Sequence, residues 1–509
     1  MKFDRILIVD FGSQYTLLIA KAVRKLRVYS EVVQPQHLST YLSSENGEHV
    51  YGIILSGGPH SVNQDHKSVV RELIEKSKMP VLGICYGAQI LASLVGAIVK
   101  TTEAGEYGYH KLELSEDNDP LHLNIPEEYT VWQSHSDSIF VVGEVNPFKI
   151  ISKRGDKIES FKYHRRPIWG LQYHPEVSHT PIGPNIFDNF LRQCKVPREW
   201  STSHFVEMII PELQSQLESN TKEKVMVACS GGVDSTVTAA LIQRAVGDRM
   251  MGIFVDPGIL RLGEYNSVLK GYRRMGLNVI GIDASSRFLD ALKGNPDPEK
   301  KRKIIGNLFI EIFKEHAPNA TWLGQGTIYP DVIESEGGIK SHHNVGGLPE
   351  KLNLQLVEPL RYLFKDDVRE LGDILGVDPI ILNRHPFPGP GLAIRILGEV
   401  TKDKVDILQR ADAIYMDLLK RRNYYKNIWQ AGAILLDSKS VGVQGDNRTY
   451  QWVVALRAVE SVNGMTASVY PFPMSFLTEV STEIINQVPE INRVTYDITT
   501  KPPGTIEWE

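Results

Sequence analysis

Cysteine is scarce in this chain of 509 residues, and its scarcity excludes two classes of protein. Only Cys85, Cys194 and Cys229 occur, far apart in the sequence and without a Cys-x-x-Cys pair. A disulfide scaffold and a thiolate zinc site are therefore excluded, and the composition fits a reducing compartment.

The sequence also lacks long apolar runs and a strong excess of either charge. No uncharged apolar stretch approaches bilayer length, and the N-terminal residues do not have the pattern of a secretory leader. The net charge of −5 is small, so nothing favours a polyanion as partner. We expect a cytoplasmic protein with no membrane and no nucleic-acid partner. Its length predicts two to four domains.

Short β-branched runs alternate with helical patterns in the first part of the chain. Residues 6–9, 52–55 and 81–84 are continuous apolar runs, each ending in a turn with glycine or serine, as is typical of buried strands. With helices between them, these runs predict a parallel sheet covered on both faces, with function at the carboxyl ends of its strands. Strands at 129–132 and 168–172 extend this sheet.

The remaining sequence predicts a second α/β domain and then a smaller α+β domain. The second α/β domain has its expected strands at 225–228, 251–255 and 279–282, and its helices at 205–217 and 235–245. Arg384–Gly391 is too rich in proline for a helix or a central strand, so we place a rigid domain junction there. Beyond it we expect a helix near 404–422 and strands at 452–456 and 493–498. The predicted domains are 1–195, 196–384 and 385–509.

Gly-Ile-Cys-Tyr-Gly at residues 83–87 places Cys85 on a glycine-flanked turn after an apolar run. Such a turn holds a nucleophile in a strained backbone position, and a helix N-terminus lowers the pKa of a thiol. His174 follows a predicted strand, and Glu176 lies two residues further along. The Glu176 carboxylate is therefore predicted to orient the imidazole, which accepts the proton of Cys85.

The predicted oxyanion hole consists of the backbone N–H groups of Gly58 and Tyr86. Cys194 has no glycine flank and no nearby base, and Cys229 ends a predicted strand, so both are interpreted as packing residues. An isolated cysteine or a His-Pro-Glu turn is also commonly structural. The ordered set of Gly57-Gly58, the Cys85 turn and His174 favours a catalytic site.

On these motifs, residues 1 to about 195 resemble a class I glutamine amidotransferase domain. The resemblance implies that Cys85 attacks the side-chain amide of glutamine. A glutamyl thioester would form, ammonia would be released, and hydrolysis would give glutamate.

A glycine-rich loop at residues 230–236 lies between a predicted strand and a predicted helix. Its backbone amides, hydroxyls and helix N-terminus form an anion site, and the lysine of a Walker A motif is absent. The loop resembles the pyrophosphatase loop that cleaves ATP between the α- and β-phosphates. The implied ATP-binding residues are Ser230, Gly231, Gly232, Val233, Asp234, Ser235 and Thr236. Asp234 is predicted to help hold Mg²⁺, which prefers oxygen ligands.

Further polar residues follow in the same domain. Asp331 and Glu334 are predicted to bind the metal, with helix capping as the alternative. Lys340, His342 and His343 are interpreted as a lid that contacts phosphate, hinged by glycine pairs on both sides. Adjacent histidines would point to opposite faces of an extended segment, which argues against a histidine metal site.

From end to end the chain resembles the glutamine-hydrolysing GMP synthetases. Residues 196–384 are similar to their ATP pyrophosphatase domain, and Arg384–Gly391 and Lys501–Glu509 are similar to their dimerisation domain. The resemblance implies that ATP activates the C2 oxygen of xanthosine 5′-monophosphate (XMP), that ammonia displaces AMP, and that the chain forms a homodimer. The implied XMP-binding residues are Arg302, Gln444, Lys501 and Glu507. The connection at 335–338 is shorter than in many members.

Two alternatives remain at this stage. One is another enzyme with a pyrophosphatase loop, such as an RNA-thiolating enzyme or NAD synthetase; the missing cysteine pairs argue against thiolation. The other is a catalytically silent binding or regulatory protein, against which the full set of expected functional residues argues.

Overall fold

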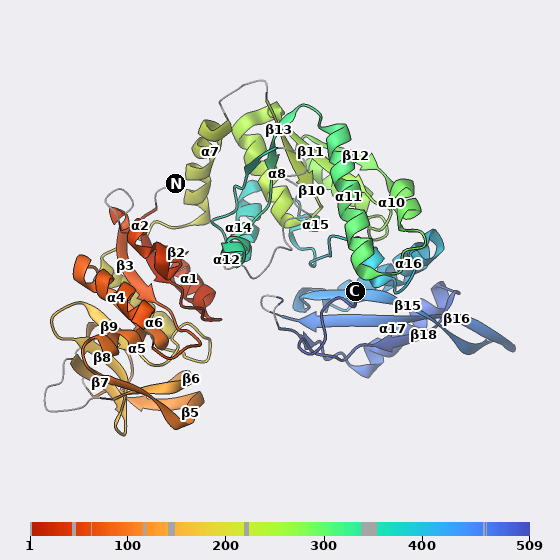
Figure 1. Cartoon of the computed structure of the whole chain (residues 1–509). Helices are drawn as coiled ribbons and strands as arrows, with labels where there is room; N and C mark the ends of the chain where they lie inside the picture. The colour runs from red at the N-terminus through yellow and green to blue at the C-terminus, as the bar shows by residue number, and fades with distance from the viewer. Residues whose placement is uncertain are drawn as a thin grey trace. The chain divides into compact units, whose positions relative to one another are not determined.

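The computed structural model describes residues 3–42, 47–62, 64–115, 119–140, 148–217, 223–336, 354–461, 464 and 466–509. The chain divides into two compact units, Met1–Phe205 and Val206–Glu509. Figure 1 colours the first unit red to yellow and the second yellow-green to blue. No helix among the described residues is long and apolar enough to cross a membrane.

The first unit is built on one mixed sheet. Its strands are β1 (Arg5–Val9), β2 (Tyr29–Val33), β3 (Val50–Leu55), β4 (Val81–Ile84), β5 (Ile98–Glu113), β6 (Glu128–Phe140), β7 (Phe148–Arg154), β8 (Lys157–Tyr163) and β9 (Ile168–Leu171). The strand order is β2-β1-β3-β4-β9-β8-β6-β5, and β7 also pairs with β8. In this spatial order, β2, β1, β3, β4 and β9 pair parallel with their neighbours. The pairs β9–β8, β8–β6, β6–β5 and β7–β8 are antiparallel.

Helices cover the parallel part of this sheet. They are α1 (Thr16–Lys25), α2 (Leu38–Tyr41), α4 (Gln64–Lys76), α5 (Tyr86–Leu94) and α6 (Gly183–Cys194). α1 packs with α6, and α4 packs with α5. Every residue of β1 and β4 is buried, as expected for strands with helices on both faces.

A second, fully parallel sheet begins the second unit. Its strands are β10 (Lys224–Cys229), β11 (Met250–Asp256), β12 (Val279–Asp283), β13 (Ala320–Gly324) and β14 (Gln355–Val357), in the order β12-β11-β10-β13-β14. The accompanying helices are α7 (Thr202–Leu217), α8 (Val233–Val246), α9 (Glu264–Arg274), α10 (Ser285–Leu292), α11 (Pro298–His316), α12 (Tyr329–Glu336), α14 (Lys365–Leu375) and α15 (Pro379–Leu382). α8 packs with α14, and α10 packs with α11.

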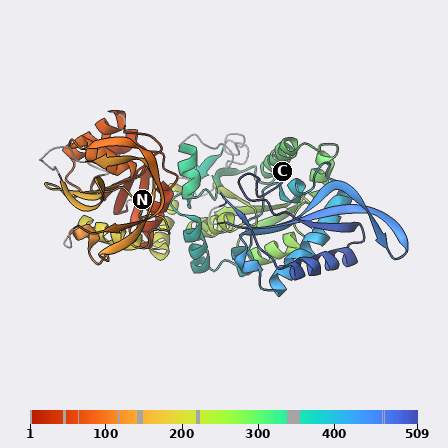
Figure 2. The same ribbon diagram turned by 90° about the horizontal axis from the view of Figure 1, so that it is seen from below.

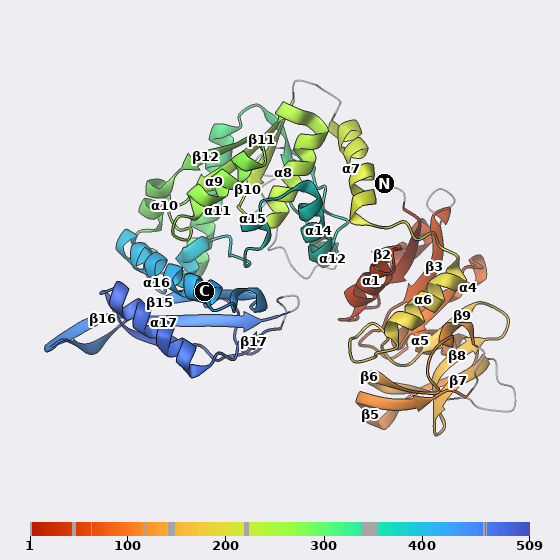
Figure 3. The ribbon, with the colours of Figure 1, turned by 180° about the vertical axis from the view of Figure 1, so that it is seen from behind.

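The chain then forms a smaller, mostly antiparallel sheet. Its elements are the 3₁₀ helix η5 (Gly391–Arg395), α16 (Lys402–Arg421), β15 (Gln430–Gln444), β16 (Asn447–Glu460), β17 (Ser468–Val469), α17 (Met474–Gln487) and β18 (Ile491–Tyr496). β15 and β16 form a long two-stranded ribbon, which Figure 2 shows extending at the blue end of the chain. α16 packs on α17 and β15, and α17 packs on β18; Figure 3 shows both helices from behind, beside β15.

One hydrophobic core joins the two sheets of the second unit. It includes Met226 and Ile253 from the parallel sheet, Leu392 from η5, Leu408 from α16 and Val454 from the smaller sheet. This shared core explains why Val206–Glu509 forms one compact unit.

The predicted α/β class and its smaller α+β portion are confirmed, and the expected strands at 81–84 and 225–228 lie in β4 and β10. The antiparallel part of the first sheet was not predicted. In β6, buried and partly exposed residues alternate over much of the strand, and this period-2 pattern is the signal for a strand with one covered face.

The first compact unit extends beyond residue 195 because of an aromatic contact. Trp200 packs on Phe3 and Tyr29, with ring centroids 5.2 and 4.9 Å away. The domain limits predicted at 195 and 384 stay predictions.

Candidate functional site

Cys85 lies in the short turn between β4 and α5, in a backbone conformation rare for a side-chain-bearing residue. Its φ is +49°, and its amide donates to the Leu171 carbonyl at 2.7 Å. The flanking glycines are required by close packing: a Cβ on Gly83 would lie 2.7 Å from the Ala88 nitrogen, and one on Gly87 would lie 2.5 Å from the Leu55 carbonyl oxygen. The structure therefore has the strained elbow predicted from the sequence.

His174 and Glu176 follow β9, the parallel neighbour of β4, and lie against this elbow. Nδ1 of His174 is 2.7 Å from Oε1 of Glu176, and both side chains are buried. Burial would lower the pKa of the His174 imidazole, but the Glu176 carboxylate and the Cys85 thiol outweigh it, so the pKa lies well above its usual range. The imidazole thus favours the charged form that a thiolate partner requires.

Gly57 and Gly58 follow β3 and complete this group. A Cβ on Gly57 would lie 3.3 Å from Cε1 of His174, and one on Gly58 would lie 3.0 Å from Cδ1 of Tyr86. The structure therefore brings together the predicted oxyanion residues Gly58 and Tyr86 with the imidazole and Cys85.

Gln172 is a neighbour of Cys85 that the sequence did not single out. Its Nε2 lies 4.0 Å from Sγ of Cys85. Cys194 and Cys229 are buried elsewhere, and burial raises the pKa of both thiols. Their interpretation as packing residues fits this burial.

In the second unit, residues 230–232 connect β10 to α8, and residues 233–236 form the first turn of α8. The Ser230 amide donates to Oγ of Ser235 at 3.1 Å, and the Gly231 amide donates to the Tyr272 hydroxyl at 3.1 Å. The Gly232 amide donates to Oγ of Ser230 at 3.4 Å. The chain's own hydroxyls therefore engage three of the amides expected to bind phosphate. The amides of Val233, Asp234 and Ser235 begin α8, and the first amides of a helix have no intrahelical acceptor.

Asp234 lies in the first turn of α8. Its Oδ2 accepts from the Lys365 ammonium at 2.5 Å, and Lys365 begins α14. Its Oδ1 is buried and has no hydrogen-bond partner in the described structure. An orphaned carboxylate oxygen beside a turn predicted to bind phosphate fits a hard cation such as Mg²⁺. Lys365 was not found from the sequence, because one lysine far along the chain carries no local signal.

Asp331 caps its own helix. Oδ2 of Asp331 accepts from the Ile328 amide at 3.0 Å, just before α12, which matches the capping alternative; its role as a metal ligand stays a prediction. The Glu334 side chain and residues 337–353, with the predicted lid residues Lys340, His342 and His343, lie outside the described residues. Among the described residues, no three of His, Cys, Asp or Glu converge on one point.

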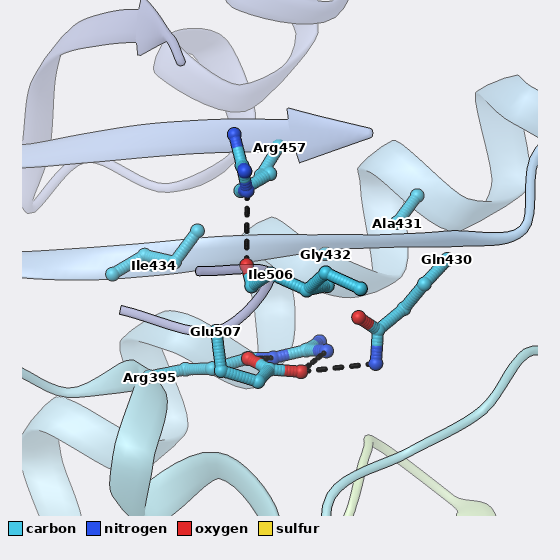
Figure 4. A pocket seen from close by; sticks show the side chains of 8 residues that line it. All are labelled: Arg395, Gln430, Ala431, Gly432, Ile434, Arg457, Ile506 and Glu507. Carbon is cyan, nitrogen blue, oxygen red and sulfur yellow. Dashed lines mark hydrogen bonds and ion pairs between the residues drawn. The ribbon is translucent and has the colours of Figure 1, made fainter. Parts of the chain in front are cut away.

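Of the predicted XMP-binding residues, Arg302, Lys501 and Glu507 have described side chains, and these three do not share the cavity in Figure 4. Arg302 donates to the Glu509 carbonyl at 2.6 Å, and Lys501 donates to the Gly464 carbonyl at 2.7 Å. Gln444 ends β15, and its side chain lies outside the described part of the chain. Glu507 alone lines the cavity in Figure 4.

The Glu507 cavity lies between β15, η5 and the C-terminal segment. Its volume is about 10 Å³, room for about one water molecule. Arg395 holds the Glu507 carboxylate with two hydrogen bonds of 2.9 and 2.7 Å, and Nε2 of Gln430 donates to it at 3.0 Å (Figure 4). Burial would raise the pKa of Glu507, but Arg395 holds it below its usual range. Arg395 and Gln430 are residues that the sequence did not identify.

Family models match three parts of the chain. Glutamine amidotransferase class-I matches residues 7–194, NAD synthase matches residues 205–284, and GMP synthase C terminal domain matches residues 417–508.

Curated relatives match over nearly the whole chain. A GMP synthase [glutamine-hydrolyzing] from Porphyromonas gingivalis is 50% identical over 99% of this chain and 100% of its own length. Proteins of the same name from Cytophaga hutchinsonii and Aquifex aeolicus are each 48% identical over 99% of this chain, covering 100% and 99% of their own lengths. The NAD synthase similarity, in contrast, is confined to the 80 residues 205–284, which include the glycine-rich turn.

Proposed function

Because this chain belongs to the family of glutamine-hydrolysing GMP synthases, we propose a specific set of residues for its glutamine-dependent synthesis of GMP. Cys85, His174 and Glu176 form the glutaminase site. The arrangement that carries this proposal is the buried His174–Glu176 pair against the Cys85 elbow.

In the glutaminase half-reaction, His174 takes the proton of Cys85, and the thiolate attacks the side-chain amide carbon of glutamine. The amides of Gly58 and Tyr86 donate to the oxygen as it becomes negative. The C–N bond then breaks, and the imidazolium gives its proton to the departing nitrogen, which leaves as ammonia. Water attacks the glutamyl thioester, giving glutamate and the free thiol.

In the synthetase half-reaction, the turn at 230–236 binds ATP. The C2 oxygen of XMP attacks the α-phosphorus, and the bond to the β-phosphate oxygen breaks, so pyrophosphate leaves. Ammonia then attacks C2, and AMP departs with the oxygen. Asp234 would hold Mg²⁺, which supplies charge to stabilise the pyrophosphate oxygens. The helix amides from Val233 to Ser235 bind phosphate without a change of shape.

The nucleotide substrate is assigned to the C-terminal part of the second unit. Glu507 accepts hydrogen bonds from the purine or ribose, and Lys501 and Arg302 contact the phosphate. The Glu507 cavity must widen for this, since it holds about one water molecule. We further propose that the chain acts in the cytoplasm as a homodimer.

The decisive measurement is the stoichiometry of one reaction mixture. Purified chain with ATP, Mg²⁺, XMP and glutamine should give glutamate, AMP, pyrophosphate and GMP in equal amounts. With ammonium chloride in place of glutamine, AMP, pyrophosphate and GMP should still form in equal amounts, and no glutamate should appear. Product formed from nicotinate adenine dinucleotide in place of XMP would assign the chain to a different reaction.

A further inference from the structure

Three arginines surround one phenylalanine ring in the second unit. The guanidinium carbons of Arg261, Arg384 and Arg395 lie 5.1, 5.2 and 5.3 Å from the centroid of Phe387, within the range of cation–π attraction. Three carboxylates balance their charges, and we call the whole group the Phe387 cluster: Phe387, Arg261, Arg384, Arg395, Glu264, Asp412 and Glu507.

One end of the Phe387 cluster holds the nucleotide turn. Nη1 of Arg384 donates to the Gly231 carbonyl at 3.2 Å, and its Nη2 pairs with Glu264. Gly231 has a φ of +75°, and a Cβ there would lie 2.9 Å from Nη1 of Arg384. Since Tyr272 accepts from the Gly231 amide, both backbone polar groups of this residue are fixed from outside the turn.

The other end holds Glu507. Arg395 is almost fully buried and binds both oxygens of this carboxylate. Burial would lower the pKa of Arg395, but Glu507 raises it above its usual value, so the pair remains charged. Nε2 of Gln430 joins the pair to the chain near Phe387 by donating to the Pro386 carbonyl at 3.0 Å.

Arg261 and Asp412 connect the two ends. Nη1 of Arg261 lies 3.5 Å from Oδ2 of Asp412, and Nη1 of Arg395 lies 3.9 Å from Oδ1 of the same carboxylate. The Arg261 amide donates to Oε2 of Glu264 at 3.0 Å. With three positive and three negative groups, displacement of one charge leaves another unbalanced in a site of low dielectric constant.

We propose that Phe387 is a positioning residue that couples the two substrate sites: through Arg384 it sets the nucleotide turn, and through Arg395 it sets the Glu507 carboxylate. ATP bound at the turn then changes the affinity of the Glu507 site for XMP, and XMP changes the affinity for ATP by the same factor. The inference rests on the proposed assignment of ATP to residues 230–236 and of XMP to Glu507.

The test is XMP binding to the full chain, measured by titration calorimetry with and without a non-hydrolysable ATP analogue and Mg²⁺. In the unmodified chain, the analogue should change XMP affinity about 5-fold or more. Phe387→Leu keeps an apolar side chain but removes the aromatic ring. In this variant the effect of the analogue on XMP affinity should fall below about 2-fold. The matched control is Phe309→Leu: Phe309 is also partly buried in this unit but packs on Phe288 and Phe313, and coupling should persist.

Arg384→Lys provides a second measurement if the leucine variant does not fold. It keeps the charge but lacks the planar fork that binds Gly231 and Glu264 together. ATP affinity should fall, and XMP affinity measured without the analogue should not change.

Two results would overturn the coupling: no effect of the analogue on the unmodified chain, or undiminished coupling in folded Phe387→Leu. Failure of the proposed function gives a different result. If XMP does not bind at Glu507, the Glu507→Gln substitution leaves XMP affinity unchanged.

Discussion

Nδ1 of His174 lies 2.7 Å from Oε1 of Glu176, and the two side chains are 4% and 0% exposed. This contact fixes the ring orientation and leaves Nε2 for the thiol. The buried Glu176 carboxylate also keeps the proton on the His174 ring. If the ring lost this proton, the carboxylate would be a buried charge without a partner, which is costly.

Cys85→Ala should remove glutamine-dependent synthesis of GMP and leave ammonia-dependent synthesis largely intact. The thiol is the proposed nucleophile, and the nucleotide turn belongs to the other compact unit. GMP formation with glutamine and then with ammonium chloride measures both. Cys194→Ala is the matched control and should retain both activities; equal loss with ammonium in Cys85→Ala would refute the division into two sites.

Glu176→Gln should lower the glutaminase rate about 100-fold or more, since the imidazole loses the partner that orients it. The carboxylate raises the pKa of His174, so its removal narrows the pH range in which the imidazolium persists. The alkaline limb of the glutaminase profile should move to lower pH. An unshifted limb would show that another group controls the titration.

Asp234→Asn should stop formation of AMP with either nitrogen source, because the pyrophosphate leaving group loses its stabilisation. Glutaminase activity should persist. Pyrophosphate release at the normal rate would remove Asp234 from the site.

The sequence predicted the elbow, the nucleotide turn and the grouping of Cys85 with His174, each marked by a local motif, but it did not predict the ion pairs between distant elements. The Cys85 elbow and the turn at 230–236 were predictable because glycines mark the positions that need unusual backbone or close packing. Lys365 pairs with Asp234 across 131 residues of sequence, and Arg395 pairs with Glu507 across 112. No local pattern encodes such pairs, since they arise only when separate elements fold together.

Lys501→Ala should raise the KM for XMP about 10-fold or more, with little change in the KM for ATP, because a charge-assisted contact to phosphate is lost. Lys501 also donates to the Gly464 carbonyl, so circular dichroism should accompany the kinetics. An unchanged KM for XMP in a folded variant would make this lysine purely structural.

His385 should make the second unit less stable in acid. Burial lowers the pKa of this imidazole to about 4, so the unfolded chain binds more protons than the folded one between about pH 4 and 6.5. Stability is therefore complete above about pH 6.5 and falls by about 2 kcal/mol on going down to pH 5.

The matched variant for this effect is His385→Phe, which keeps a ring to stack on Tyr425 but has no titrating group. Urea unfolding at pH 7.5 and pH 5 should show a smaller loss for the variant. Equal losses would mean that other groups cause the acid sensitivity.

The burial of Cys194 and Cys229 gives the chain a distinct response to oxidants. Their raised thiol pKa values keep both sulfurs in the unreactive protonated form, so neither would compete for peroxide with Cys85, the proposed nucleophile. The nitrogen donor would then switch: an oxidised enzyme would depend on free ammonium while its nucleotide chemistry continued. Oxidative stress would thus link guanine nucleotide supply to the ammonium content of the cell, and a thiol reductant would restore the use of glutamine.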